Sequence, residues 1–383
     1  MRLSFARSED PGDGRVGATP ETVATLVDRG LEVEIETGAG AAAGHDDEDY
    51  RQAGATVVDA EKLLATSEAL VTVAPPSPAR IAALPEGSAL IGFLRPVHDT
   101  ELARALAERR ITALAMELVP RIGKAQAMDA LSSQAGIAGY KAVLIAANTI
   151  DKLFPLSMTA AGTVKPARVV VLGVGVAGLQ AIATAKRLGA TVEANDVRAA
   201  AADEVASLGA DFVHIPGVTD QSDGVYAKKL GADLARAQHE ALAPHVARAD
   251  AVICTAQIPG RDAPVLLTAE MVDRMPAGSV VVDLAAEDGG NCELTASGEP
   301  PDRGGTKVVP APRLAAAMPR EASALYARNV VNLLARIVTE EGSLDVDADP
   351  ELVGFLLARG GEVLHEPTAA ALRSARDTSE ATS

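Results

Sequence analysis

VVVLGVGVAGLQAIATAKRLGATVEANDVR, residues Val169–Arg198, decides the fold of this chain. A β-branched run leads into a turn with glycines at positions 173, 175 and 178; an alanine-rich helical pattern follows, and a second short run ends at Asp196. Gly173 permits a tight turn, Gly175 lets a ligand approach the backbone, and Gly178 lets the helix pack closely against the strand. The stretch therefore predicts a parallel α/β unit whose helix begins at the glycine turn.

The turn and the acid together predict the ligand. The N-terminus of a helix presents free N–H groups and the positive end of its dipole, and both favour a pyrophosphate. Asp196 lies 18 residues after Gly178, near the spacing of a carboxylate that accepts both ribose hydroxyls of an adenosine. A negative charge there repels a 2′-phosphate, so we expect NAD(H) rather than NADP(H). A packing turn without a ligand is the alternative, which the register of strand, helix and acid disfavours.

Composition bounds the class of protein. A chain of 383 residues is too long for one ordinary core and suits two domains. The net charge of −17 argues against nucleic acid and anionic membrane surfaces. Two isolated cysteines, Cys254 and Cys292, fit a reducing cytoplasm, and the six histidines show no ligand spacing, so we expect no metal site. The charged N-terminus is unlike a signal peptide, and the longest uncharged run contains the glycine turn, so we expect no insertion into a membrane.

Strand and helix signals alternate along both halves of the chain, which is the rhythm of doubly wound sheets. The fold class that we predict is α/β, with two Rossmann-like doubly wound domains joined by long helices. Residues 1–136 plus 322–383 form the first domain, completed by the C-terminal segment, and residues 137–321 form the NAD-binding domain. The joining helices are expected at Ile137–Phe154 and Ala322–Val338, and a flap is expected from Gly217 through the helical stretch ending at Ala247.

Three runs carry a resemblance that covers nearly the whole chain. They are RIGKAQAMDALSSQAGIAGYKAV (Arg121–Val143), MTAAGTVKPARVVVLGVGVAGLQAIATAKRLGA (Met158–Ala190) and DLAAEDGGNCELT (Asp283–Thr295). The chain resembles the NAD(H)-binding alpha subunits of the proton-translocating transhydrogenases, whose relatives include alanine dehydrogenase. The second run is common to both groups. The first and third runs favour the transhydrogenases, because alanine dehydrogenase differs in both places.

The resemblance implies a nicotinamide site in the first of these runs. Arg121 and Ser132 would bond the carboxamide of NAD(H), Asp129 would orient Arg121, and Gln126 would reach a second nucleotide, NADP(H), on a partner component. Direct hydride transfer needs two nicotinamide rings held in near-attack contact, and it needs no acid or base on the protein. The alternative is a polar interdomain loop with a surface ion pair, which the matching flanks disfavour.

The resemblance also places adenosine contacts in the second domain. Besides the glycines of the turn, it assigns them to Val176, Asp196, Val197 and Arg198. Gln238 and Gln257 are further cofactor-binding candidates, and Tyr226 matches a tyrosine of the mobile loop that closes over nucleotide in the family. The resemblance further implies a homodimer, an NADP(H)-binding component and membrane-spanning subunits that conduct protons. The chain itself is then cytoplasmic and peripheral at the inner face of the plasma membrane.

Alanine dehydrogenase is one alternative function. That enzyme needs a lysine and a general acid/base histidine, and the aligned positions hold Ala74 and Arg95. Arg15, which would hold the substrate carboxylate there, is present, and His98 is a poor substitute for the histidine. The segment Val308–Asn329, with its PREAS sequence, is closer to alanine dehydrogenase than to the transhydrogenases.

A second alternative is a non-enzymatic NAD(H) sensor, in which the loop closes on nucleotide and changes a partner surface. Gln126 and its neighbours discriminate between the two classes, because they have a task only if a second nicotinamide arrives.

Overall fold

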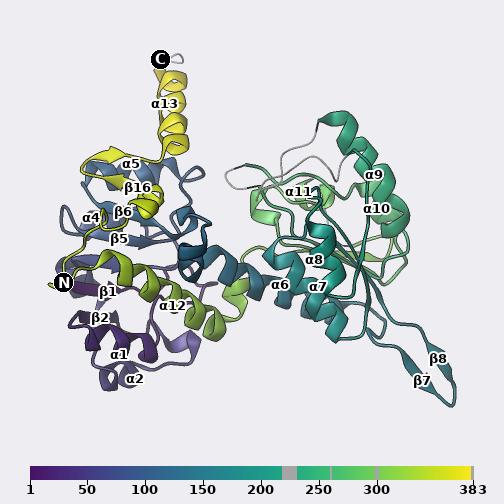
Figure 1. Cartoon of the computed structure of the whole chain (residues 1–383), viewed down its shortest axis with the longest axis horizontal. Coiled ribbons are helices and arrows are strands. Elements are labelled where there is room, and N and C mark those ends of the chain that lie inside the picture. Colours follow the sequence, from purple (N-terminus) through teal and green to yellow (C-terminus); the bar gives the residue numbers. More distant parts are fainter. Residues whose placement is uncertain (218–230, 259–260, 298–301, 381–383) are drawn as a thin grey trace. The chain divides into compact units, whose positions relative to one another are not determined.

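The computed structural model describes residues 1–217, 231–258, 261–297 and 302–380 (Figure 1). The chain divides into two compact units. Unit 1 comprises Met1–Gln134 with Ala316–Ser383, and unit 2 comprises Ala135–Ala315. The sequence expectation placed these divisions after residues 136 and 321. Each unit contains one large, mainly parallel sheet, which confirms the α/β fold with two Rossmann-like domains.

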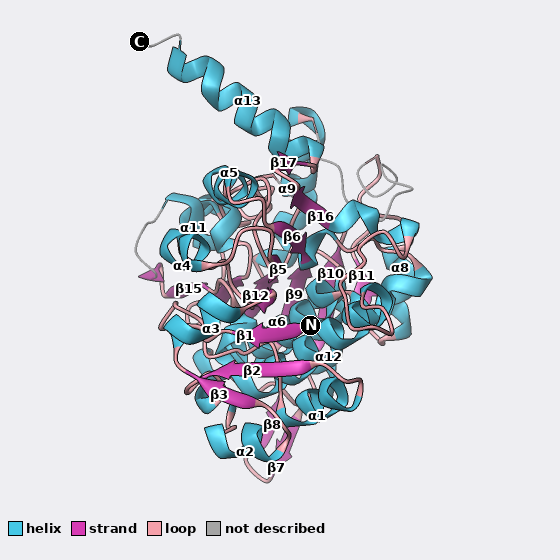
Figure 2. Ribbon diagram, turned by 90° about the vertical axis from the view of Figure 1, so that its left-hand side faces the viewer, coloured by secondary structure: helices cyan, strands magenta, loops and turns pink. Residues whose placement is uncertain are grey.

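The sheet of unit 1 has the order β17-β16-β6-β5-β4-β1-β2-β3. Its first six strands in sequence pair in parallel, whereas β16 pairs antiparallel with β6 and β17 pairs antiparallel with β16 at that edge (Figure 2). The strands are β1 (Arg2–Phe5), β2 (Glu32–Glu36), β3 (Thr56–Val58), β4 (Ala69–Val71), β5 (Ala89–Gly92), β6 (Thr112–Ala115), β16 (Leu356–Arg359) and β17 (Glu362–Val363). The helices are α1 (Pro20–Asp28), η1 (Ala41–Ala43), α2 (Asp47–Gln52), α3 (Ala60–Thr66), α4 (Pro78–Ala83), α5 (Thr100–Glu108), η2 (Met116–Leu118), η3 (Gly123–Met128), α12 (Pro319–Ile337), η6 (Pro350–Phe355) and α13 (Glu366–Glu380).

Unit 2 repeats this strand order, with β11-β10-β9-β12-β13-β15 parallel and β14 antiparallel at the edge. The strands are β9 (Arg168–Leu172), β10 (Thr191–Asn195), β11 (Asp211–Phe212), β12 (Ala251–Cys254), β13 (Val280–Asp283), β14 (Asp302–Arg303) and β15 (Thr306–Pro310). The helices are α7 (Val176–Arg187), α8 (Ala201–Ser207), α9 (Ala232–Val246), α10 (Ala269–Asp273), η4 (Ala286–Asp288), α11 (Glu293–Ser297) and η5 (Leu314–Ala317). The winding direction reverses between β9 and β12, where the carboxyl ends of the strands form the ligand crevice of such sheets.

Alternate residues of the central strands enter different cores. In β9, Val169 and Val171 pack in one cluster and Val170 and Leu172 in another. In unit 1, Leu70 of β4 likewise belongs to a different cluster from its two neighbours. Side chains of a strand point to opposite faces in turn, so a strand covered on both faces must be apolar throughout. This burial explains the continuous aliphatic runs of the sequence.

The helix α6 (Ala130–Thr149) begins earlier than the sequence predicted and also ends earlier. The expected start at Ile137 is wrong because Asp129 accepts hydrogen bonds from the first turn, as a helix N-cap does. The division between the units falls within α6, after Gln134. The second division falls within η5, so α12 lies wholly in unit 1, with Tyr326 and Val330 in its core.

A hairpin of β7 (Ser157–Thr159) and β8 (Gly162–Val164) projects from the rest of unit 2 (Figure 1). The sequence pattern did not predict it, because five of its six strand residues are exposed and produce no alternation of apolar and polar positions. Its two strands and the residues just before them carry exposed apolar side chains, including Leu156, Met158 and Val164.

Candidate functional site

The glycine turn after β9 has little room for side chains. Gly173 has a φ of +96°, and a Cβ atom there would lie 2.7 Å from the backbone nitrogen of Ala256. A Cβ atom at Gly178 would lie 2.0 Å from the carbonyl oxygen of Gly173. Both positions therefore require glycine, one for its backbone conformation and one for close packing of α7 against the strand.

Gly175 is different, because the space beside it is open. No atom would lie within 4 Å of a Cβ at this position. Gly175 is the N-cap residue of α7 and has no side-chain capping bond, and Val176 behind it is 41% exposed. The first N–H groups of the helix consequently have no side-chain cap, at a point where the backbone is accessible. This arrangement fits a pyrophosphate.

Asp196 lies directly after β10, at the position expected for the ribose contact. Its carboxylate also hydrogen-bonds the backbone of the glycine turn. Its Oδ2 accepts a hydrogen bond from the backbone N–H of Val174 at 2.7 Å, and its Oδ1 accepts one from the backbone N–H of Arg198 at 2.9 Å. The guanidinium of Arg198 also lies against Oδ1 and donates to the carbonyl of Val174. A carboxylate has about four lone-pair sites, so these three bonds leave room for a ribose hydroxyl. Val197 between them is partly buried.

The three further candidates of unit 2 differ in their surroundings. Gln238 is buried, and its Nε2 donates to Oδ1 of Asn195 at 3.2 Å, so this amide is engaged inside the unit. Gln257 is exposed, and its Nε2 donates to Oδ2 of Asp288 at 2.9 Å. Tyr226 lies outside the described residues.

Two residues that support the glycine turn escaped the sequence analysis. The hydroxyl of Thr255 donates to the carbonyl oxygen of Gly173 at 2.8 Å. Asn291 is completely buried, exchanges two hydrogen bonds with the backbone of Ala256 and donates a third to the carbonyl of Pro264. Asn291 lies within the third run of the resemblance, but nothing in the run singles out its amide.

In unit 1, the proposed nicotinamide loop combines buried anchors with exposed polar groups. Ala125 and Met128 of η3 are buried in the core of the unit. Gln126 lies between these anchors and Arg121 lies before them, and both side chains are exposed. The apolar anchors fix the backbone while the polar side chains remain accessible to a ligand.

Asp129 and Ser132 form a pair at the start of α6. The Oδ1 of Asp129 accepts the backbone N–H of Ser132 at 2.9 Å, and its Oδ2 accepts the hydroxyl of Ser132 at 2.6 Å. Asp129 thus orients the Ser132 hydroxyl, an interaction that the sequence analysis did not anticipate. The pair places Ser132 in the first turn of the helix, which fixes its side chain more firmly than a loop would.

Arg15 is buried and hydrogen-bonded to two other side chains of unit 1. Its Nε and Nη2 donate to the two oxygens of Asp13 at 2.8 and 2.6 Å, and its Nη1 donates to Oε1 of Gln134 at 2.9 Å. All three residues are buried. Three of the five N–H donors of Arg15 are thus bonded within the unit, so a substrate carboxylate would have to compete for them or use the two that remain.

Glu117 is a buried carboxyl group beside the segment that holds Arg95. Its Oε1 accepts the backbone N–H groups of Leu94 and Arg95 at 2.8 and 2.6 Å. Its Oε2 is buried and has no hydrogen-bond partner among the residues that the structure describes. Burial raises the pKa of Glu117 to about 7, although the two backbone donors and the charge of Arg95 oppose the shift.

Glu117→Gln is expected to flatten the pH dependence of stability. Above the ordinary pKa of 4.5 the unfolded chain releases the Glu117 proton, whereas the folded chain retains it to about pH 7. The free energy of unfolding therefore falls as pH rises across this window, by about 3 kcal/mol at roughly 1.4 kcal/mol per unit. Urea unfolding of parent and variant between about pH 4 and 8 measures the difference. Parallel curves for the two proteins would contradict the assignment.

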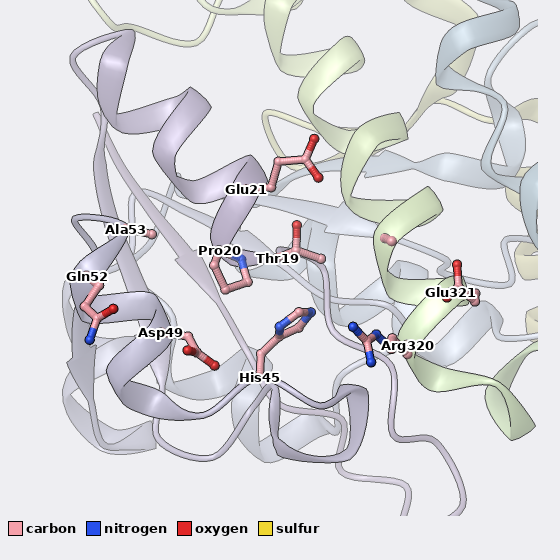
Figure 3. Close-up of a pocket in the computed structure, with 10 residues that line it drawn as sticks. Thr19, Pro20, Glu21, His45, Asp49, Gln52, Ala53, Arg320 and Glu321 are labelled. Carbon is pink, nitrogen blue, oxygen red and sulfur yellow. The ribbon is translucent and has the colours of Figure 1, made fainter.

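A cavity of about 540 Å³ opens in unit 1 between α1, α2 and α12 (Figure 3). Its lining includes Glu21, His45, Asp49, Arg320 and Glu321, side chains of both charges. It contains none of the candidate site residues, and we assign no ligand to it. Within the described ranges, no cluster of three or more His, Cys, Asp or Glu side chains is arranged to hold a metal ion. No described helix is long and apolar enough to cross a bilayer.

Two models of known protein families match this chain, one in its N-terminal part and one in its C-terminal part. The model of the alanine dehydrogenase/PNT N-terminal domain matches residues 6–138, and that of the alanine dehydrogenase/PNT C-terminal domain matches residues 142–366. The chain belongs to the alanine dehydrogenase/PNT family. Together the two family models span both compact units, which confirms the resemblance seen in the sequence.

Within the family, the chain is more similar to transhydrogenase subunits than to alanine dehydrogenases. The first part of the NAD(P) transhydrogenase alpha subunit of Rhodospirillum rubrum is 43% identical, over 95% of this chain and 98% of the relative. Alanine dehydrogenase of Bacillus subtilis is 29% identical, over 96% of this chain and 94% of the relative. Among solved structures, a transhydrogenase from Sinorhizobium meliloti matches with a TM-score of 0.86 and 41% identity, covering 95% of this chain and 100% of that one. An L-alanine dehydrogenase matches with a TM-score of 0.81 and 27% identity, covering 98% and 99%.

The segment Val308–Asn329, which departs from the transhydrogenase pattern, forms the end of β15, then η5, and then the first half of α12. Arg313 within it has a φ of +51°, and its Nε lies 2.9 Å from Oε1 of Glu287. Despite its unusual sequence, the segment builds the expected strand and helix.

Proposed function

We propose that this chain is the NAD(H)-binding component of a proton-translocating transhydrogenase. The observation that carries the proposal is the 43% identity to a transhydrogenase alpha subunit along nearly the full length of both chains. The glycine turn with its open N-terminal helix end, and the exposed side chains of Arg121 and Gln126 near the Asp129–Ser132 pair, support it from the structure. NADP(H) is held by a partner component in this proposal.

In the reaction, NADH bound to this chain supplies a hydride, which passes with its electron pair to the nicotinamide of NADP⁺ on the partner. In this proposal, the residues of this chain bind NADH and orient its nicotinamide. The helix N-terminus at Gly175 receives the pyrophosphate, and Asp196 accepts the adenosine ribose. Arg121 and Ser132 hold the carboxamide, with Ser132 oriented by Asp129, and Gln126 faces the partner nucleotide. The protein moves no proton in this step, so it needs alignment and exclusion of water rather than an acid or base.

The proposed assembly includes membrane-spanning subunits that couple hydride transfer to proton movement, and it places this chain at the cytoplasmic face of the plasma membrane. We also propose a homodimer. The β7–β8 hairpin supports it, because Met158 is 75% exposed and neighbouring Leu156 and Val164 are exposed too, and clustered exposed apolar side chains mark interaction surfaces. Sedimentation of the purified chain tests this, and a monomer at high micromolar concentration would contradict it.

The direct test of the function is transfer between two nucleotides. The purified chain is mixed with a transhydrogenase NADP(H)-binding component, and reduction of an NADP⁺ analogue by NADH is followed by stopped-flow absorbance. We expect transfer only when both proteins are present. Absence of transfer, with NADH binding demonstrated in the same sample, would contradict the proposal.

Alanine oxidation is the matching negative expectation. We expect the purified chain to lack turnover with L-alanine and NAD⁺, because Ala74 and Arg95 stand where the relative needs lysine and histidine, and because Arg15 is engaged by Asp13. Formation of NADH at 340 nm measures the activity. A turnover in the ordinary enzymatic range, on the order of 1–1000 per second, would assign the chain to alanine dehydrogenase instead.

A further inference from the structure

A mostly buried network of hydrogen-bonded polar side chains connects the N-terminal segment of unit 1 with the proposed nicotinamide loop. It begins at the ion pair of Asp13 and Arg15, whose side chains are 1% and 9% exposed. From Arg15 it continues to Oε1 of Gln134, and Nε2 of Gln134 donates to the carbonyl of Ala322 at 3.0 Å and to the hydroxyl of Ser133 at 3.3 Å.

The network of hydrogen bonds ends at the backbone of the proposed nicotinamide loop. The hydroxyl of Ser133 donates to Oδ1 of Asn329 at 2.7 Å, and Nδ2 of Asn329 donates to the carbonyl oxygen of Ala127 at 2.8 Å. Nδ2 of Asn332, one turn later on α12, donates to the same oxygen at 3.1 Å. This carbonyl belongs to the Ala127–Met128 peptide, one residue beyond Gln126, so the two asparagines hold the backbone close to the residue assigned to the partner nucleotide.

Burying these polar groups has a free-energy cost, which indicates that they do more than fill the core. Burying an amide or a charge is unfavourable unless each group finds partners, and apolar side chains would fill the same volume at lower cost. Here Asn329 is 7% exposed, and both ends of its amide are bonded. A hydrogen-bonded polar network, here mostly buried, favours one arrangement of the backbone that it holds. The backbone held here is that of η3, between the buried anchors Ala125 and Met128.

We propose that Asn329, held in place by the Asp13–Arg15–Gln134–Ser133 network, is a positioning residue that sets the backbone at Ala127 and so aims Gln126 at the incoming nucleotide. The proposal rests on the proposed function. In this chain the arginine that would bind substrate carboxylate in alanine dehydrogenase supports the hydride-transfer loop instead. The network needs no contact with NAD(H) for this role.

The test measures NADH affinity and hydride transfer separately for Asn329→Ala. We expect the variant to bind NADH almost as the parent does, by fluorescence titration. Its single-turnover transfer to an NADP⁺ analogue, with an NADP(H)-binding component added, should slow by roughly 10- to 100-fold, since small misplacements have effects of this size. Asn332→Ala removes only the exposed donor, so it should fold normally and show a smaller slowing.

Ile337→Ala is the matched control for lost stability, because Ile337 is buried in the same helix at its far end. Its transfer rate per folded molecule should equal that of the parent. Parent rates in both asparagine variants would overturn the positioning role, as would a slowing of Asn329→Ala no greater than that of Ile337→Ala. If the parent itself transfers no hydride, the proposed function fails, which is a separate outcome.

Discussion

Gln126→Ala is expected to slow hydride transfer by roughly 100-fold while leaving NADH binding nearly intact. Gln126 is exposed on η3, between the buried anchors Ala125 and Met128, so its removal leaves the loop backbone in place. In the proposed function its amide meets the second nucleotide rather than the NADH of this chain. NADH titration and stopped-flow transfer, each on parent and variant, measure the two quantities. Gln52→Ala, an exposed glutamine of α2 in the same unit, is the control and should change neither.

Arg121→Ala should behave differently, because Arg121 holds the carboxamide of the chain's own cofactor in the proposal. Both NADH affinity and transfer are expected to fall together. If Gln126→Ala transfers hydride at the parent rate, the role assigned to the loop is wrong, and a non-enzymatic NAD(H) sensor becomes the better reading of the same nucleotide site.

Asp196→Asn is expected to weaken NADH binding by about 1–3 kcal/mol, the range for leaving hydrogen-bonded groups without a partner. The structure provides two reasons. An amide has only one acceptor oxygen, so it loses either the bond to the N–H of Val174 or the bonds to Arg198. The ribose hydroxyl also loses a charged acceptor. The variant should therefore lose hydrogen bonds both to the glycine turn and to the ribose.

The same carboxylate is expected to make the parent bind NADH far better than NADPH. A 2′-phosphate would meet the charge of Asp196, and the guanidinium of Arg198 already lies against Asp196 at 3.3 Å. Calorimetric titration with both nucleotides measures the preference, which Asp196→Asn should reduce. Asp211→Asn makes the same change of charge at an exposed position of β11 and should not alter the preference. Equal affinities of the parent for the two nucleotides would contradict the expected preference for NADH.

The strands and the nucleotide turn were predictable from the sequence because their causes are local. A central strand buried on both faces is mainly apolar, and a left-handed turn next to a close-packed helix favours glycine. The prediction was less accurate for α6, whose first turn is rich in serine and small residues, and it missed the β7–β8 hairpin, whose exposed strands produce no alternating pattern.

By itself, the sequence determined the two α/β domains, the glycine turn and the family to which the chain belongs. Only the tertiary structure showed which groups Arg15 and Asn329 bond, because these partners are distant along the chain. Arg15 meets Gln134 across 119 positions, and Asn329 meets Ala127 across 202. A buried polar side chain is tolerated only where the fold supplies donors and acceptors, and that supply depends on how the helices pack rather than on neighbouring residues.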